Sequence, residues 1–124
     1  MILVLGGIGA GKKEYVRSLG YADADFTSDP DERKPVFGGL DAYLRENPID
    51  TDKLFHTLLK KEVVICAEVG SGVIPLERAE RAYRETVGRL CVILAQEASA
   101  VVRVVAGIPV VIKGNVFTHA GLSQ

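Results

Sequence analysis

The sequence predicts an α/β domain of three layers, with helices on both faces of a mainly parallel central sheet. Apolar runs typical of strands buried on both faces alternate with helical segments along the 124 residues. The clearest runs are residues 2–5 and Val63–Ala67, and each is followed within three residues by glycine. Strands separated by helices usually pair in parallel. A chain of this length typically organises one core, so we expect residues 1–124 to form a single domain.

Between these two strands the pattern predicts three helices and one irregular segment. Gly20 ends the first helix, and the segment after it is rich in Asp, Pro and Ser, with a short strand expected near residues 22–26. Asn47-Pro48 ends the second helix, because the residue before a proline avoids the helical region. Asp50 or Thr51 caps the third. In order, the predicted segments are the helix 12–19, the loop 21–35, the helix Leu40–Glu46 and the helix from Asp50 or Thr51 to Lys60.

The second half of the chain contains the helix with the most regular apolar pattern. Pro75 suits the first turn of a helix, since its missing N–H would be unpaired there. Apolar residues then follow close to a 3.6-residue period as far as Ala98. The remaining predicted segments are strands 101–106 and 110–113, separated by Gly107-Ile108-Pro109, and a flexible tail from about residue 115.

Composition excludes several classes of function. Fifteen basic residues against sixteen acidic ones leave a formal charge of −1, which gives no electrostatic footprint for nucleic acid. No apolar run is long enough to span a membrane, and residues 1–5 lack the basic leader of a signal peptide. Cys66 and Cys91 show neither metal-ligand spacing nor a disulfide framework. We therefore expect a reduced, cytoplasmic protein that binds neither nucleic acid nor membranes.

A glycine-rich motif lies between the first strand and the first helix. Its G-x-x-x-x-G-K spacing is most of the phosphate-binding loop signature. Glycines let backbone N–H groups converge on an anion, and Lys12 would reach the β- and γ-phosphates. Lys13 replaces the Ser or Thr that normally ligates Mg²⁺, so we expect phosphate binding with magnesium held weakly, or held through water and acidic groups elsewhere. The alternative is a strand–helix turn that uses glycine for structure alone. The motif residues are Gly6, Gly7, Ile8, Gly9, Ala10, Gly11 and Lys12.

A second constellation begins at Glu68, which ends the second buried strand and precedes the turn Gly70-Ser71-Gly72. Proteins of this class place their ligands at the carboxyl edge of the parallel sheet. There, the carboxylate of Glu68 would face the phosphates, order metal-bound water or accept a hydroxyl proton. A solvated residue at the end of a strand is the open alternative.

These residues resemble the adenosylcobinamide kinase/adenosylcobinamide-phosphate guanylyltransferase family of cobalamin biosynthesis. The family pattern N-E-V-G-x-G-I-V-P is similar to residues 67–75, and V-V-x-G-I-P is similar to residues 104–109. The helix between them carries Tyr83-Arg84-Glu85 and Gly88-Arg89 where the family has F-R-D and G-R. The start of the chain is also similar, and residues 36–41 weakly match V-D-C-L-T. The resemblance covers about residues 62–113 and 1–20.

The resemblance implies a P-loop-type kinase that uses GTP or ATP, with Mg²⁺, to phosphorylate a corrinoid hydroxyl. Lys12 and the loop would hold the phosphates, and Lys13 would weaken magnesium binding. Glu68 would orient metal-bound water or the accepting hydroxyl, and Asp41 is a distant candidate for metal support. The resemblance further implies a homotrimer.

The departures from the family pattern point to a reduced activity. Residues 21–35 contain no histidine and are too short for the family helix whose histidine takes the guanylyl group. Ala67 replaces the family's Asn, and Cys91-Val92 replace Asn-Gln. We therefore expect guanylyl transfer to be lost. The alternative is a non-catalytic module, regulatory or scaffolding, that binds a nucleotide or a corrinoid.

Overall fold

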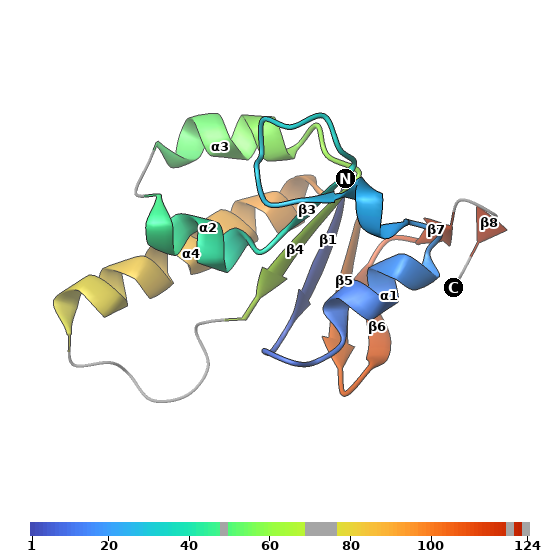
Figure 1. The fold of residues 1–124 in the computed structure, drawn as a ribbon. Helices are drawn as coiled ribbons and strands as arrows, with labels where there is room; N and C mark the ends of the chain where they lie inside the picture. The colour runs from blue at the N-terminus through green and yellow to red at the C-terminus, as the bar shows by residue number, and fades with distance from the viewer. Residues whose placement is uncertain (48–49, 69–76, 119–120, 123–124) are drawn as a thin grey trace.

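The computed structural model of the protein describes residues 1–47, 50–68, 77–118 and 121–122. Its main strands are β1 (Ile2–Gly6), β2 (Phe26–Thr27), β3 (Val36–Gly38), β4 (Val63–Ala67), β5 (Ala100–Val105) and β6 (Ile108–Lys113). Its helices are α1 (Lys12–Ser18), α2 (Leu40–Glu46), α3 (Thr51–Leu58) and α4 (Arg78–Glu97). The six strands form one sheet in the order β2-β3-β4-β1-β5-β6. Helix α1 covers one face, while α2, α3 and α4 cover the other (Figure 1). The predicted three-layer α/β architecture is confirmed.

The sheet is parallel except at one edge. β1 pairs in parallel with β4 and β5, and β3 pairs in parallel with β2 and β4. β5 and β6 form an antiparallel hairpin. The parallel strands therefore end at one edge of the sheet, at the bottom of the view in Figure 1. Gly6, at the end of β1, lies opposite Ala67 on one side and Val104 on the other.

The β5–β6 hairpin differs from the predicted boundaries. β6 begins at Ile108, so the turn consists of Ala106 and Gly107 rather than residues 107–109. Both turn residues have positive φ, 49° and 78°, which is the geometry of a two-residue hairpin turn that matches strand twist. Pro109 is tolerated inside β6 because this strand lies at the sheet edge.

The short strand predicted near residues 22–26 is instead a 3₁₀ turn over Asp23–Asp25 followed by β2, and the sequence pattern did not predict β3. The ends of the helices lie close to their predicted positions where the structure describes them. Asp50 caps α3, and its side chain accepts a hydrogen bond from the amide of Asp52. The predicted helix start at Pro75 lies outside the described residues. The expected flexible tail includes a short strand pair, β7 (Phe117–Thr118) with β8 (Gly121–Leu122).

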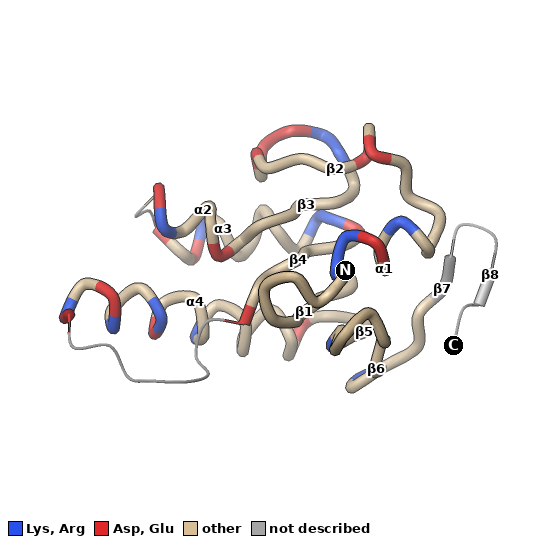
Figure 2. The backbone as a smooth tube through the Cα atoms, turned by 60° about the horizontal axis from the view of Figure 1, so that its bottom comes forward, with Lys and Arg blue, Asp and Glu red and all other residues tan. Residues whose placement is uncertain are grey.

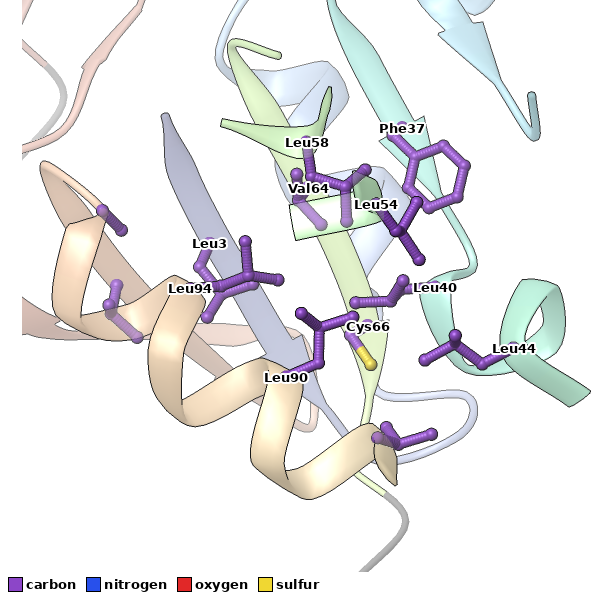
Figure 3. Packing of buried hydrophobic residues seen from close by; sticks show 13 residues of the cluster. Leu3, Phe37, Leu40, Leu44, Leu54, Leu58, Val64, Cys66, Leu90 and Leu94 are labelled. Carbon is purple, nitrogen blue, oxygen red and sulfur yellow. The ribbon is translucent and has the colours of Figure 1, made fainter. Parts of the chain in front are cut away.

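Two hydrophobic clusters hold the layers together. The larger one packs α2, α3 and α4 on the sheet, with Leu90 and Leu94 of α4 facing Leu3 of β1 and Cys66 of β4 (Figure 3). The smaller one packs α1 on the opposite face, where Val4 of β1 is buried. Leu3 and Val4, neighbours in β1, thus pack into different clusters on opposite faces of the sheet. Burial on both faces explains why this strand is a continuous apolar run.

Most charged residues of α4 lie in its amino-terminal half, where Arg and Glu are interspersed (Figure 2). Glu80 and Arg84, and Glu85 and Arg89, are ion pairs at i,i+4 with N···O distances of 4.0 Å. Within the part of the chain that the structure describes, no helix has the length and apolar character needed to cross a membrane.

Candidate functional site at the carboxyl edge of the sheet

The glycine-rich loop leaves β1 at the carboxyl edge and enters α1. Gly9 and Gly11 have φ angles of 75° and 94°, in the left-handed region that side chains rarely adopt. The amide of Ala10 donates to the carbonyl of Gly7 at 3.2 Å, which closes a turn inside the loop. From outside, the amide of Gly107 donates to the carbonyl of Ala10 at 2.7 Å. The β5–β6 turn therefore supports the loop.

The ammonium group of Lys12 folds back over the loop. Its Nζ donates a hydrogen bond to the carbonyl oxygen of Gly7 at 2.7 Å. Several loop amides have no hydrogen-bond acceptor among the described residues, which leaves them available to an anion. These amides belong to Ile8, Gly9, Gly11, Lys12 and Lys13. Backbone donors of a glycine-rich loop, together with a cation on the same loop, can bind a phosphate group.

Glu68 lies directly beside the start of the loop. Its backbone amide donates to the carbonyl of Gly6 at 2.9 Å. Both of its carboxylate oxygens accept hydrogen bonds from Arg103 of β5, from Nε at 2.8 Å and from Nη2 at 3.1 Å. The Glu68 side chain is 25% exposed and that of Arg103 is 52% exposed. This ion pair reaches across β1, and hydrogen bonding to Glu68 raises the pKa of Arg103.

Arg103 was not among the residues that the sequence pattern singled out. The available signal was a single charged residue within an apolar strand, which is uncommon in a buried sheet. Arg103 lies opposite Leu5 of β1, and Leu5 lies opposite Cys66 of β4. The strand order thus places Arg103 close enough to Glu68 for a bidentate contact.

Asp41 contacts Ala67, the residue that precedes Glu68 in the chain. Asp41 belongs to the first turn of α2, which follows β3. Its Oδ1 accepts a hydrogen bond from the amide of Ala67 at 3.1 Å. The hydroxyl of Tyr83 in α4 donates to the backbone carbonyl of Asp41 at 2.6 Å. Asp41 therefore bridges the ends of β3 and β4 and connects this edge with α4.

Lys13 extends from the loop towards the end of β3. Its Cε lies 3.9 Å from the position that a Cβ would occupy on Gly38. The side chain is exposed, and no described residue accepts a hydrogen bond from its ammonium group or pairs with it. Lys12, Lys13, Asp41 and Glu68 thus lie at one edge of the sheet, and their roles in a site stay predictions.

The oxygen donors at this edge do not fit a magnesium ion well. Mg²⁺ demands near-octahedral oxygen ligands. Position 13 supplies an ammonium group, both carboxylate oxygens of Glu68 are bound to Arg103, and Oδ1 of Asp41 is bound to an amide. Among the described residues, no three His, Cys, Asp or Glu side chains gather into a metal site. The metal-supporting roles of Glu68 and Asp41 stay predictions.

A groove of about 630 Å³ lies between α4 and the helices α2 and α3. Tyr83, whose hydroxyl contacts Asp41, lines this groove. Arg45 forms one wall, with two hydrogen bonds to Glu80 at 2.9 and 3.0 Å. The guanidinium carbon of Arg45 lies 4.0 Å from the centroid of the Tyr83 ring. Leu44 and Leu90 contribute apolar surface. The groove is amphipathic, and Tyr83 connects it with Asp41.

Comparison with known proteins gives a match to a family model. A family model described as cobinamide kinase / cobinamide phosphate guanyltransferase matches residues 40–112, which is more than half of the chain. The matched region contains Asp41, Glu68 and Arg103, whereas the glycine-rich loop precedes it. No curated protein matches the chain.

Proposed function

Because the chain belongs to the cobinamide kinase / cobinamide phosphate guanyltransferase family, we propose that it binds GTP or ATP at the glycine-rich loop and transfers the γ-phosphoryl group to a cobinamide hydroxyl. The observation that carries this proposal is the position of Lys12. Its Nζ lies 2.7 Å from the carbonyl oxygen of Gly7, in a loop with several amides that have no acceptor among the described residues. A phosphate oxygen would replace that carbonyl as the acceptor.

Phosphoryl transfer of this kind requires no covalent bond between the protein and the substrate. The acceptor oxygen bonds to the γ-phosphorus, and the bond from phosphorus to the β–γ bridging oxygen breaks. The products are a phosphate ester, a nucleoside diphosphate and a proton. Catalysis of this kind is mostly positioning and neutralisation of charge. Lys12 and the loop amides would hold the phosphates, while Glu68, fixed by Arg103, would orient the acceptor hydroxyl.

The groove beside Tyr83 suits a large acceptor. Its lining combines apolar side chains with charged groups, as a corrinoid with apolar and amide surfaces requires. The hydroxyl of Tyr83 contacts Asp41, whose carboxylate contacts the strand that ends at Glu68. An acceptor in the groove would therefore lie next to the edge that holds the phosphates.

Guanylyl transfer is not part of the proposed activity. The segment 21–35, where the resemblance would place the guanylylated histidine, contains none. It forms a 3₁₀ turn over Asp23–Asp25 and the two-residue strand β2. His56 lies on α3 with its ring against Phe55, so it offers no substitute at the carboxyl edge.

Calorimetry with GTP and ATP tests the nucleotide site. Wild-type protein should bind at least one of them, and Lys12→Met should weaken binding roughly tenfold or more, because a charge-assisted hydrogen bond to phosphate is lost. Lys60→Met, which removes an exposed lysine after α3, is the matched control and should bind as the wild type does. No binding of either nucleotide at millimolar concentration would refute the site.

A non-catalytic nucleotide- or corrinoid-binding module is the second candidate, favoured by the poor magnesium donor set. Incubation with a nucleoside triphosphate and cobinamide, followed by chromatography, distinguishes the two. A kinase yields cobinamide phosphate and a nucleoside diphosphate, whereas the module leaves both ligands unchanged. The homotrimer and the cytoplasmic location stay predictions, and light scattering tests the former.

A further inference from the structure

The carboxyl edge gathers an unusual set of charges. Lys12, Lys13 and Arg103 are cationic, and Glu68 and Asp41 are the carboxylates beside them. We propose that Lys13 takes the place of the divalent cation at this edge and neutralises the polyphosphate of a bound nucleoside triphosphate directly, so that binding needs no Mg²⁺. This inference rests on the proposed nucleotide site.

The carboxylates at the edge are already engaged within the protein. Arg103 occupies both oxygens of Glu68 at 2.8 and 3.1 Å, and the amide of Ala67 occupies Oδ1 of Asp41 at 3.1 Å. A metal ion would have to share these three oxygens with their protein partners. Binding a divalent cation beside an ammonium group also carries electrostatic repulsion.

Lys13 has the position that this role requires. Its stem passes Gly38, with 3.9 Å between Lys13 Cε and the position that a Cβ would occupy there. β3 lies beside β4, and β4 beside β1, so this stem lies at the same edge of the sheet as the loop. No described residue pairs with the ammonium group of Lys13.

The two lysines approach this edge from different directions. Consecutive residues of a helix do not face each other, and Lys12 folds over Gly7 whereas Lys13 extends towards Gly38. A polyphosphate between them would contact one ammonium group on each side. A divalent cation normally provides such charge neutralisation by bridging the β- and γ-phosphates.

Calorimetry with GTP, and separately with inorganic tripolyphosphate, tests the inference in Mg²⁺ and in EDTA. The affinity of the wild-type protein should differ less than about twofold between the two conditions. In EDTA, Lys13→Met should weaken binding roughly tenfold or more, because a charge-assisted contact with phosphate is lost. Lys13→Ser should bind weakly in EDTA and recover in Mg²⁺, since a hydroxyl at this position is the usual ligand.

Two controls separate this role from general effects. Lys60→Met removes the same charge from an exposed site after α3 and should keep wild-type affinity in both conditions. Lys13→Arg keeps the charge and should bind without Mg²⁺. Lys13 is exposed, so thermal unfolding of its variants should match the wild type.

The outcomes distinguish the role of Lys13 from the proposed nucleotide site on which it depends. Wild-type binding that falls tenfold or more in EDTA overturns the role of Lys13 and leaves the nucleotide site intact, and this comparison requires no variant. An unchanged affinity of Lys13→Met in EDTA has the same consequence. If the wild-type protein binds neither ligand in either condition, the nucleotide site fails and this inference fails with it.

Discussion

Replacing Gly6 by alanine should destabilise the protein, whereas the same change at its neighbour Gly7 should not. A Cβ on Gly6 would lie 2.7 Å from the carbonyl oxygen of Val104 and 3.2 Å from Cγ of Lys12. The Val104 oxygen belongs to the backbone of β5, which pairs with β1 and cannot rotate away. Relief requires a shift of the strands, which typically costs about 1–3 kcal/mol of the free energy of unfolding.

Urea unfolding at constant temperature measures this difference. For a chain of this size, the loss corresponds to a fall in Tm of about 4 °C for each kcal/mol. A Cβ on Gly7 would meet no atom within 4 Å, and its backbone is outside the left-handed region. Gly7→Ala should therefore stay within about 0.5 kcal/mol of the wild type. Equal midpoints for the two variants, with unchanged slopes, would contradict the close approach of β1 and β5 at Gly6.

Leu90 is 2% exposed, so Leu90→Ala should lower the free energy of unfolding by about 2–5 kcal/mol in urea titrations. Hydrogen bonding to Arg45 lowers the pKa of Glu80. A lowered carboxyl pKa stabilises the fold above the usual carboxyl pKa, and this contribution is lost as the pH falls through the lowered value. Wild-type protein should thus lose more stability on acidification than Glu80→Gln, as urea unfolding at neutral and acidic pH will show. A hydrogen bond with Cys91 and burial raise the pKa of Cys66, so iodoacetamide should modify Cys66 only after unfolding, which mass spectrometry detects.

Most of the fold follows from local sequence patterns. Val63–Ala67 is buried along its whole length, and that environment is what a continuous apolar run indicates. The capping residue Asp50 also follows from local chemistry, since its side chain pairs with the amide two residues later. The hairpin boundary was less predictable. Pro109 suggests a turn locally, yet it lies inside β6 because the edge position removes the need for its N–H.

The candidate site shows where local patterns stop being informative. The loop motif and Glu68 could be predicted, because both directly follow apolar strands. The contact between Arg103 and Glu68 could not, since it depends on β1 lying between β4 and β5. The same holds for Asp41, whose contact with Ala67 depends on β3 lying beside β4. Strand order is a property of the whole sheet, and no short segment encodes it.

The glycine-rich loop precedes the region that the family model matches, residues 40–112, but the β5–β6 hairpin inside that region contacts the loop. Gly107 donates a hydrogen bond to Ala10 at 2.7 Å, and its Cα lies 3.3 Å from the position of a Cβ on Gly11. Arg103, on the same hairpin, holds Glu68 beside Gly6. The matched residues therefore set both the shape of the loop and the position of its neighbouring carboxylate. If the proposed nucleotide site is correct, a change that moves the hairpin turn should alter nucleotide binding, which calorimetry measures, even though the turn itself supplies no charge to the ligand.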